Sequence, residues 1–251
     1  MRKLVLSAAA LLAMGIGSLG TIGAAQAYDP FHNCNFLPAS PNGNQARVCL
    51  VNTNNAHPIT VQLGKGGKLT LKRFEGWLNK ASIVQFWVSY KSDGTIVQIK
   101  GRNNEGTILQ WGDFSKAKIT QLWGSHNDAG IFQGIFADWD RASITQKGGR
   151  YNDAYISQYG DGDSASIKQN HGFANDASVT QYGDHNHASV TQNGGAFNDA
   201  SVTQGGDHNT AAITENGGFN NDATVVQNGN GGSANIVIDG GSNNHPVVYQ
   251  N

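Results

Sequence analysis

The sequence has few of the residues that usually carry covalent or metal chemistry. It contains two cysteines in 251 residues, and they form neither a Cys-x-x-Cys redox motif nor a zinc-ligand set. The nucleophile elbow Gly-x-Ser-x-Gly, the zinc motif His-Glu-x-x-His and a phosphate-binding glycine loop are all missing from it. We therefore expect a protein that is not an enzyme and that uses no cofactor and no metal ion.

Charged residues are also scarce. They make up 14% of the chain, and the formal net charge is −1, so the basic footprint of a nucleic-acid-binding protein is missing. Residues 56–150 hold thirteen Lys and Arg against seven Asp and Glu, whereas residues 151–251 hold one against ten. Two interpretations remain open: solvated outer faces, or complementary ends or faces that favour ordered association.

Long hydrophobic runs are limited to the N-terminus. A positively charged start precedes an apolar stretch from Leu4 to Ile22, and Ala25-Gln26-Ala27 then forms an Ala-x-Ala cleavage site. Residues 1–27 are therefore predicted to be a secretory signal peptide. We expect the mature chain to have no membrane span and to lie outside the cytoplasm.

One short phrase, Ala-x-Val/Ile-x-Gln, fills most of the remaining sequence. It occurs fifteen times between residues 81 and 250, and Ile or Val stands two residues before every final position. From residue 142 the steps alternate between 12 and 11 residues, which gives a period of 23. A fixed period of this length is typical of a solenoid.

The phrase predicts which side chains face inward. Alternate residues of a strand lie on one face, so Ala, Val/Ile and Gln share a face with the Asn that often stands two residues before Ala. We expect an all-β fold, a β-solenoid of stacked 23-residue strand-turn-strand rungs. Its inward amides are expected to form hydrogen-bonded ladders between rungs. The predicted ladder residues are Gln146, Gln158, Gln169, Gln181, Gln192, Gln204, Gln227, Gln250, Asn175, Asn186, Asn198, Asn209 and Asn221.

The chain divides into four segments by this criterion. The signal peptide is followed by residues 28–55, expected to be irregular because prolines and an Asn-Gly pair interrupt them. Residues 56–141 carry degenerate, Trp-rich repeats whose first part, up to residue 80, lacks the anchor residues, and residues 142–251 carry regular repeats. Cys34 and Cys49 are expected to form a disulfide worth about 3 kcal/mol, with free thiols as the alternative.

Turn residues recur with the same period. Asp follows Asn in one class of turn, at Asp153, Asp176, Asp199 and Asp222, so these carboxylates are expected to stack one rung apart. Two roles are open for them: solvated gatekeepers that slow self-association through like-charge repulsion, or a ladder for divalent cations. Three histidines in the other class of turn match no strong metal motif and are interpreted as turn residues. They are His185, His187 and His208.

The first half of the chain holds all five tryptophans. Together with nearby cations they could form a sugar-binding or surface-binding face, or they could be ordinary outer-face ladders or a capping core. The residues concerned are Trp77, Trp87, Trp111, Trp123, Trp139, Arg73, Lys91, Lys100 and Arg102. At the other end the last phrase, 247–250, is preceded by Pro246 as its only edge-breaking residue, so end-to-end stacking is expected.

The repeat resembles a known family. Gln181-x-Gly183-x-x-Asn186-x-Ala188-x-x-x-Gln192 is similar to the curlin repeat, found in the subunits of bacterial curli fibres. The resemblance implies export to the periplasm with curli-type chaperones and passage through an outer-membrane pore, for which residues 28–55 would be the targeting segment. It also implies assembly with itself and with other curlin-like subunits into extracellular amyloid for adhesion and biofilm matrix. By the same resemblance the Gln and Asn ladders drive assembly, and Gly and Asp in the turns moderate it.

The chain departs from the familiar subunits in its number of repeats, its tryptophans and its cysteines. The alternative function is therefore a capped, monomeric, secreted β-solenoid that acts as an adhesin or carbohydrate-binding surface protein. Such a protein would stay monomeric on incubation, whereas a curlin subunit would not.

Overall fold

The structure is a computed structural model that describes residues 34–37, 45–54, 57–62, 66–86, 90–135 and 137–251. All regular elements in these ranges are β-strands. They form two sheets, and from β2 on successive strands of the chain alternate between the two. The predicted signal peptide, residues 1–27, lies outside the described residues.

Sheet A has ten strands, and from β2 on the chain returns to it every second strand. Its members, in spatial order, are β1 (Cys34–Leu37), β2 (Gln45–Asn54), β4 (Lys68–Trp77), β6 (Asp93–Ile99), β8 (Lys116–Leu122), β10 (Arg141–Lys147), β12 (Ser164–Asn170), β14 (His187–Asn193), β16 (Thr210–Asn216) and β18 (Ser233–Asp239).

Sheet B has nine strands and forms the second layer. Its members, in sequence order, are β3 (His57–Gln62), β5 (Lys80–Gln85), β7 (Glu105–Gln110), β9 (Asp128–Gln133), β11 (Asp153–Gln158), β13 (Asp176–Gln181), β15 (Asp199–Gln204), β17 (Asp222–Gln227) and β19 (Val247–Gln250).

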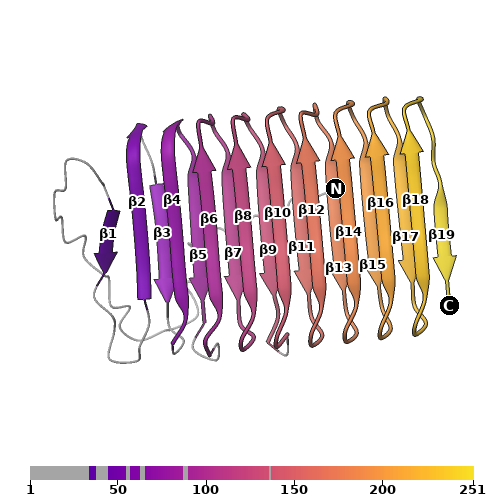
Figure 1. Ribbon diagram of the computed structural model, residues 1–251, viewed down its shortest axis with the longest axis horizontal. Coiled ribbons are helices and arrows are strands. Elements are labelled where there is room, and N and C mark those ends of the chain that lie inside the picture. The colour runs from indigo at the N-terminus through magenta and orange to yellow at the C-terminus, as the bar shows by residue number, and fades with distance from the viewer. Residues whose placement is uncertain (1–33, 38–44, 55–56, 63–65, 87–89, 136) are drawn as a thin grey trace, which may run out of the picture.

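The strands stack in a parallel, in-register array along the long axis (Figure 1). In β11 and β13, for example, Ala154 lies opposite Ala177 and Gln158 opposite Gln181, a shift of 23 residues. Each strand therefore places the same residue type beside itself in the next rung. The predicted β-solenoid with a 23-residue repeat is confirmed.

The core lies between the two sheets and is one residue layer deep on each side. Strands from β6 to β17 alternate buried with partly or fully exposed residues, as a period of two requires. The Ala and Ile/Val positions form one continuous cluster; Ile144 and Ile167, for example, are 0% exposed. The predicted inward face is therefore the one that the structure buries.

Longer repeats in the first half leave the strand register unchanged. Gln85 and Gln110 are 25 residues apart, as are Gln121 and Gln146, yet each pair is hydrogen-bonded between stacked strands. The extra residues fall in the turns, where insertions disturb no ladder bond.

The parallel array begins earlier than the sequence analysis placed it. Strand β2 lies inside the segment expected to be irregular, yet it pairs in parallel with β4. In β3, Gln62 lies opposite Gln85, so the anchor residue thought to be missing before residue 80 is present there. Strand β1 differs from the rest because it pairs antiparallel with β2.

Candidate assembly interface

A chain of glutamine side chains runs along sheet B. The Nε2 of Gln158 donates to the Oε1 of Gln181 at 3.0 Å, and Gln181 donates to Gln204 at 2.9 Å. Gln204 then donates to Gln227 at 3.0 Å, and Gln227 to Gln250 at 2.6 Å. All the donors point the same way along the stack, so the ladder has a direction, from the N-terminal rungs toward β19.

A second glutamine ladder runs along sheet A. Gln146 donates to Gln169 and Gln169 to Gln192, both at 2.9 Å. The Nε2 of Gln169 also lies 2.9 Å from the carbonyl of Asp153 and 3.1 Å from that of Asn175, which flank it in sheet B. These side chains are buried, and a buried amide needs such partners to offset its lost hydration. The ladder therefore ties neighbouring rungs and the two sheets together.

Asparagine side chains form further ladders at the turns. The Oδ1 of Asn152 accepts the backbone N–H of Asn175 at 3.1 Å, and Asn175 accepts that of Asn198 in the same way. On the other edge Asn186 accepts the N–H of Asn209 at 2.9 Å. Each Asn thus satisfies a backbone donor one rung later, which explains why the repeat keeps Asn at this position.

Three carboxyl groups occupy ladder positions where the repeat otherwise places amides or hydroxyls. Asp140 and Asp163 precede Asn186 in one turn ladder, and Glu215 follows Gln192. Burial is the main cause that raises the pKa of Asp140 to about 8 and those of Asp163 and Glu215 to about 7. One oxygen of each lacks a hydrogen-bond partner within the described residues.

These buried carboxyl groups were not among the predicted site residues. The sequence signal was available, because Asp140, Asp163 and Asn186 are each 23 residues apart. Only the three-dimensional stack shows that a carboxyl group here is shielded from water.

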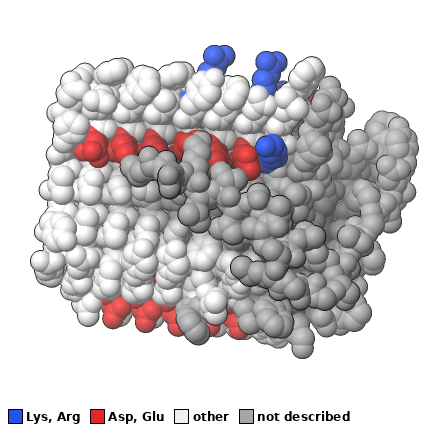
Figure 2. All heavy atoms as spheres, turned by 180° about the vertical axis from the view of Figure 1, so that it is seen from behind, with Lys and Arg blue, Asp and Glu red and all other residues white. Residues whose placement is uncertain are grey.

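The four predicted turn aspartates, Asp153, Asp176, Asp199 and Asp222, lie directly opposite one another in successive strands. Figure 2 shows acidic side chains in rows along the long axis. Burial, and then the charge of Asp222, raise the pKa of Asp199. The predicted stacking of these residues is confirmed, and their role as gatekeepers remains a prediction.

A second acidic row lies at the turns that lead into sheet A. The Oδ1 of Asp184 accepts the N–H of Asp161, and Asp207 accepts that of Asp184, both at 2.9 Å. These carboxylates therefore also hold the turn backbone. His185 and His208 follow two of them and stack with ring centroids 5.2 Å apart, as turn residues of successive rungs.

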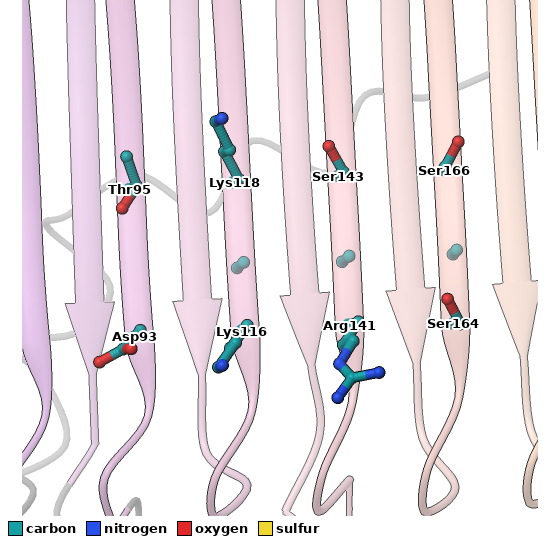
Figure 3. Close-up of a pocket in the computed structure, with 11 residues that line it drawn as sticks. Asp93, Thr95, Lys116, Lys118, Arg141, Ser143, Ser164 and Ser166 are labelled. Atoms are coloured by element: carbon teal, nitrogen blue, oxygen red, sulfur yellow. The ribbon is translucent and has the colours of Figure 1, made fainter.

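Basic side chains gather on the outer face of sheet A. Lys116, Lys118 and Arg141 project from β8 and β10, beside Asp93 of β6 (Figure 3). The positions on β12 and β14 equivalent to these cations hold Ser164, Ser166 and Ser189, together with His187. The cations of the first half therefore lie partly on the outer face of sheet A, over β8 and β10.

The two ends of the stack differ. Within the described residues β18 pairs only with β16, and β19 only with β17. At the other end β1 lies against the outer edge of β2, with Cys34 opposite Cys49 in the antiparallel register. Opposite residues in such a pair have Cα atoms within disulfide range. The disulfide remains a prediction.

The tryptophans do not form one face. Trp77 and Trp123 lie in one groove at the turns leading to sheet B. Trp111 stacks on Phe86 at the end of sheet B strands, with centroids 3.9 Å apart, and Trp139 stacks on Phe114 at the opposite turns.

Trp87 and the Arg73 side chain lie outside what the structure describes. Lys91 is near Tyr90 and Phe114 and not near the groove.

A model of the curlin associated repeat matches residues 140–170, 171–194 and 195–229. Residues 140–229 of this chain are therefore curlin associated repeats. The matched segments contain β10–β12, β13–β14 and β15–β17, so the repeat boundaries follow the turns of the solenoid. No curated protein matches the chain.

The curlin repeat of this protein extends structurally beyond the matched residues. β8 continues the ladder of β10 in register, through Gln121 and Gln146, although β8 lies outside the match. Curlin repeats are found in the subunits of curli fibres, and the side-chain ladders described above supply contacts that fit stacking. Among the described residues no helix is long and apolar enough to cross a membrane.

Proposed function

We propose that this curlin-repeat protein is a structural subunit of extracellular, curli-like amyloid fibres that support cell adhesion and biofilm matrix. The observation that carries the proposal is the in-register glutamine ladder that reaches β19. Gln227 donates to Gln250, and the strand that holds Gln250 has a neighbour on one side only within the described residues.

A second copy supplies the most suitable partner for this edge. Strand β3 carries Gln62 at the anchor position and Pro58 four residues before it, and β19 carries Gln250 with Pro246 four residues before it. Stacking β19 against β3 of another molecule would continue the sheet B ladder with like residues. Main-chain hydrogen bonds supply the affinity in such strand addition, and the side-chain ladders supply the register.

Export completes the proposal. Residues 1–27 would direct the chain to the periplasm, and curli-type chaperones and an outer-membrane pore would release it outside the cell. The support is the sequence of the signal segment and the membership of the curlin-repeat family.

The test is thioflavin T fluorescence over time on purified residues 28–251, with fibre diffraction of any product. We expect a sigmoidal rise of the fluorescence and a meridional reflection at ~4.7–4.8 Å, the spacing between stacked strands. Seeding with preformed fibres then distinguishes a main subunit from a nucleator. A flat trace from a β-rich monomer would overturn the proposal and leave the monomeric adhesin.

A further inference from the structure

A shallow groove of about 880 Å³ follows one long edge of the solenoid, at the turns that lead from sheet A to sheet B. It spans four successive turns, which contain Gly76, Gly101, Gly124 and Gly149. Four turns at the spacing of stacked strands cover about 14 Å from first to last. The groove lies along the side of the stack, so it does not overlap the ends that would meet in a fibre.

Glycine forms the floor of the groove because the asparagine ladder lies directly beneath it. Asn104 donates from Nδ2 to the carbonyl of Gly124 at 3.1 Å. A Cβ at Gly101 would collide with that Nδ2, and one at Gly124 would collide with the Nδ2 of Asn127. The floor is therefore main chain, and a ligand in the groove can approach it closely.

Aromatic rings line the groove and remain open to solvent. Trp77 is 56% exposed, Trp123 is 58% exposed and Tyr151 is 51% exposed. Trp123 and Tyr151 have positive φ values of 57° and 59°. This left-handed backbone conformation sets the direction of the Cα–Cβ bond of each residue. Tyr151 stacks on His126, with ring centroids 4.9 Å apart. Exposed ring surface of this extent in a groove points to a ligand with flat, apolar faces.

The charges beside these rings are mainly positive. Lys100 pairs with Glu75 at 3.3 Å, which leaves Arg102 and Arg150 in excess over the carboxylates that line the groove. The guanidinium carbon of Arg102 lies 5.8 Å from the centre of the Trp77 ring. An arginine held beside an aromatic face can pair with a carboxylate of a ligand whose ring stacks on that face.

The repeat does not require these residues. The register row that begins with Trp77 and Arg102 continues as Ser125, Arg150, Phe173, Ala196, Phe219 and Ser242. Lys168 is the only Lys or Arg after Arg150, so later turns keep the glycine floor and some rings but have no cations. The cationic groove is therefore a local addition to the solenoid.

We propose that this groove binds an acidic polysaccharide, one whose pyranose rings stack on Trp77 and Trp123 and whose carboxylates pair with Arg102 and Arg150. The C–H face of a pyranose is flat and apolar and fits an indole ring, and an extended sugar chain fits an open groove. A nucleic acid is less suitable because its dense phosphates require a broad basic surface, whereas this chain has a net charge of −1. The proposal does not depend on fibre assembly.

The experiment is binding of polygalacturonate oligomers to the purified chain, measured by isothermal titration on fresh monomer. Trp77→Ala and Trp123→Ala are each expected to weaken binding by about tenfold, equivalent to about 1.4 kcal/mol. Arg102→Gln is expected to weaken it and to reduce its dependence on salt. The matched control is Phe219→Ala, an exposed ring in the same register row as Trp77, which is expected to change the affinity less than about twofold.

Each other outcome contradicts the proposal. Equal binding of neutral dextran would show that the charges take no part. Tighter binding of oligo-dT would identify a nucleic-acid site instead. Equal loss in Phe219→Ala and Trp77→Ala would show that any exposed ring on this edge is sufficient. All these variants change exposed side chains, and circular dichroism verifies that the solenoid is intact.

Discussion

At the residue scale, one position of the sheet A strands holds a ladder amide in successive rungs from Gln98 to Gln192, and a carboxyl group in its place changes its chemistry. Gln192 donates to Glu215 at 2.8 Å, and the ladder ends there because the next residue in the register is Ile238. Burial favours the neutral form of this side chain, because an ionised carboxylate loses most of its hydration there.

Glu215→Gln should therefore stabilise the monomer above neutral pH. The pKa of Glu215 is raised to about 7, so the folded state holds its proton more tightly than the unfolded state. Stability is then highest in acid and falls as the pH rises from about 4.5 to about 7, by roughly 2–3 kcal/mol for this group. The variant should remove that loss of stability, because its amide carries no charge at any pH of the experiment. Its Nε2 can also donate to backbone carbonyls, as the other ladder glutamines do.

Urea unfolding of monomer at pH 5 and pH 8, followed by circular dichroism, measures this effect. The control is Thr210→Ser, which changes an exposed residue of the same strand, alters no titratable group and should keep the pH dependence of the native chain. An identical fall in stability from pH 5 to pH 8 in the native chain and in Glu215→Gln would show that Glu215 is not shielded. Asp140 and Asp163 should respond in the same direction, since burial raises their pKa values too.

At the element scale, stacking strands of the same sequence places the same charged residue side by side in successive rungs. A single aspartate at a strand start is harmless, but Asp153, Asp176, Asp199 and Asp222 come to lie in one row. Like charges about 4.8 Å apart repel by roughly 0.9 kcal/mol in water. At the C-terminal end of the row, the Nδ1 of His245 lies 3.9 Å from the Oδ2 of Asp222.

Replacing these four aspartates by asparagine should shorten the lag of fibre formation. The repulsion opposes every rung that forms, and it should disappear when the row is neutral. Thioflavin T lag times at low ionic strength measure the change, and the difference should shrink in high salt because salt screens surface charges. An unchanged lag would rule out the gatekeeper role. Shortening of the native lag by calcium, lost in the variant, would favour the cation ladder instead.

At the scale of the whole molecule, the stack has two unlike ends. β18 and β19 each pair on one side within the described residues, whereas β1 covers part of the edge of β2. The glutamine ladder also has a direction, because every Nε2 points toward the next rung along the chain. A fibre built by adding such units would be polar.

Tyr249→Pro should slow elongation while leaving the monomer folded. The carbonyls of Pro246 and Gln250 accept hydrogen bonds from Thr224 and Asn228, so the alternate residue Tyr249 directs its N–H away from β17. Proline there removes one donor from the outer edge only, where strands tolerate it. Seeded growth rates should fall about tenfold, equal to about 1.4 kcal/mol in the transition state. Tyr249→Thr keeps the N–H and is the control; equal growth of both variants would show that this edge does not add subunits.

The sequence by itself determined the repeat, the inward and outward faces and the turn residues. A 23-residue period with Ala, Ile or Val and Gln on alternate positions permits one arrangement, because only a stack buries every copy of the same face. For the same reason the glutamine ladders and the aspartate row followed from spacing alone. Both are contacts between equivalent positions, and the period states which positions are equivalent.

The tertiary structure decided everything that departs from the period. It brought Trp77 and Trp123 into one groove and placed Trp139 on the opposite turns. These residues lie in turns of unequal length, so the 23-residue period does not predict which of them come together. It placed β2 in the array and β1 antiparallel beside it. It also showed that Asp140, Asp163 and Glu215 are buried, and burial is what shifts their protonation. Solvent exposure depends on what surrounds a residue from several rungs at once, and a single strand does not contain that information.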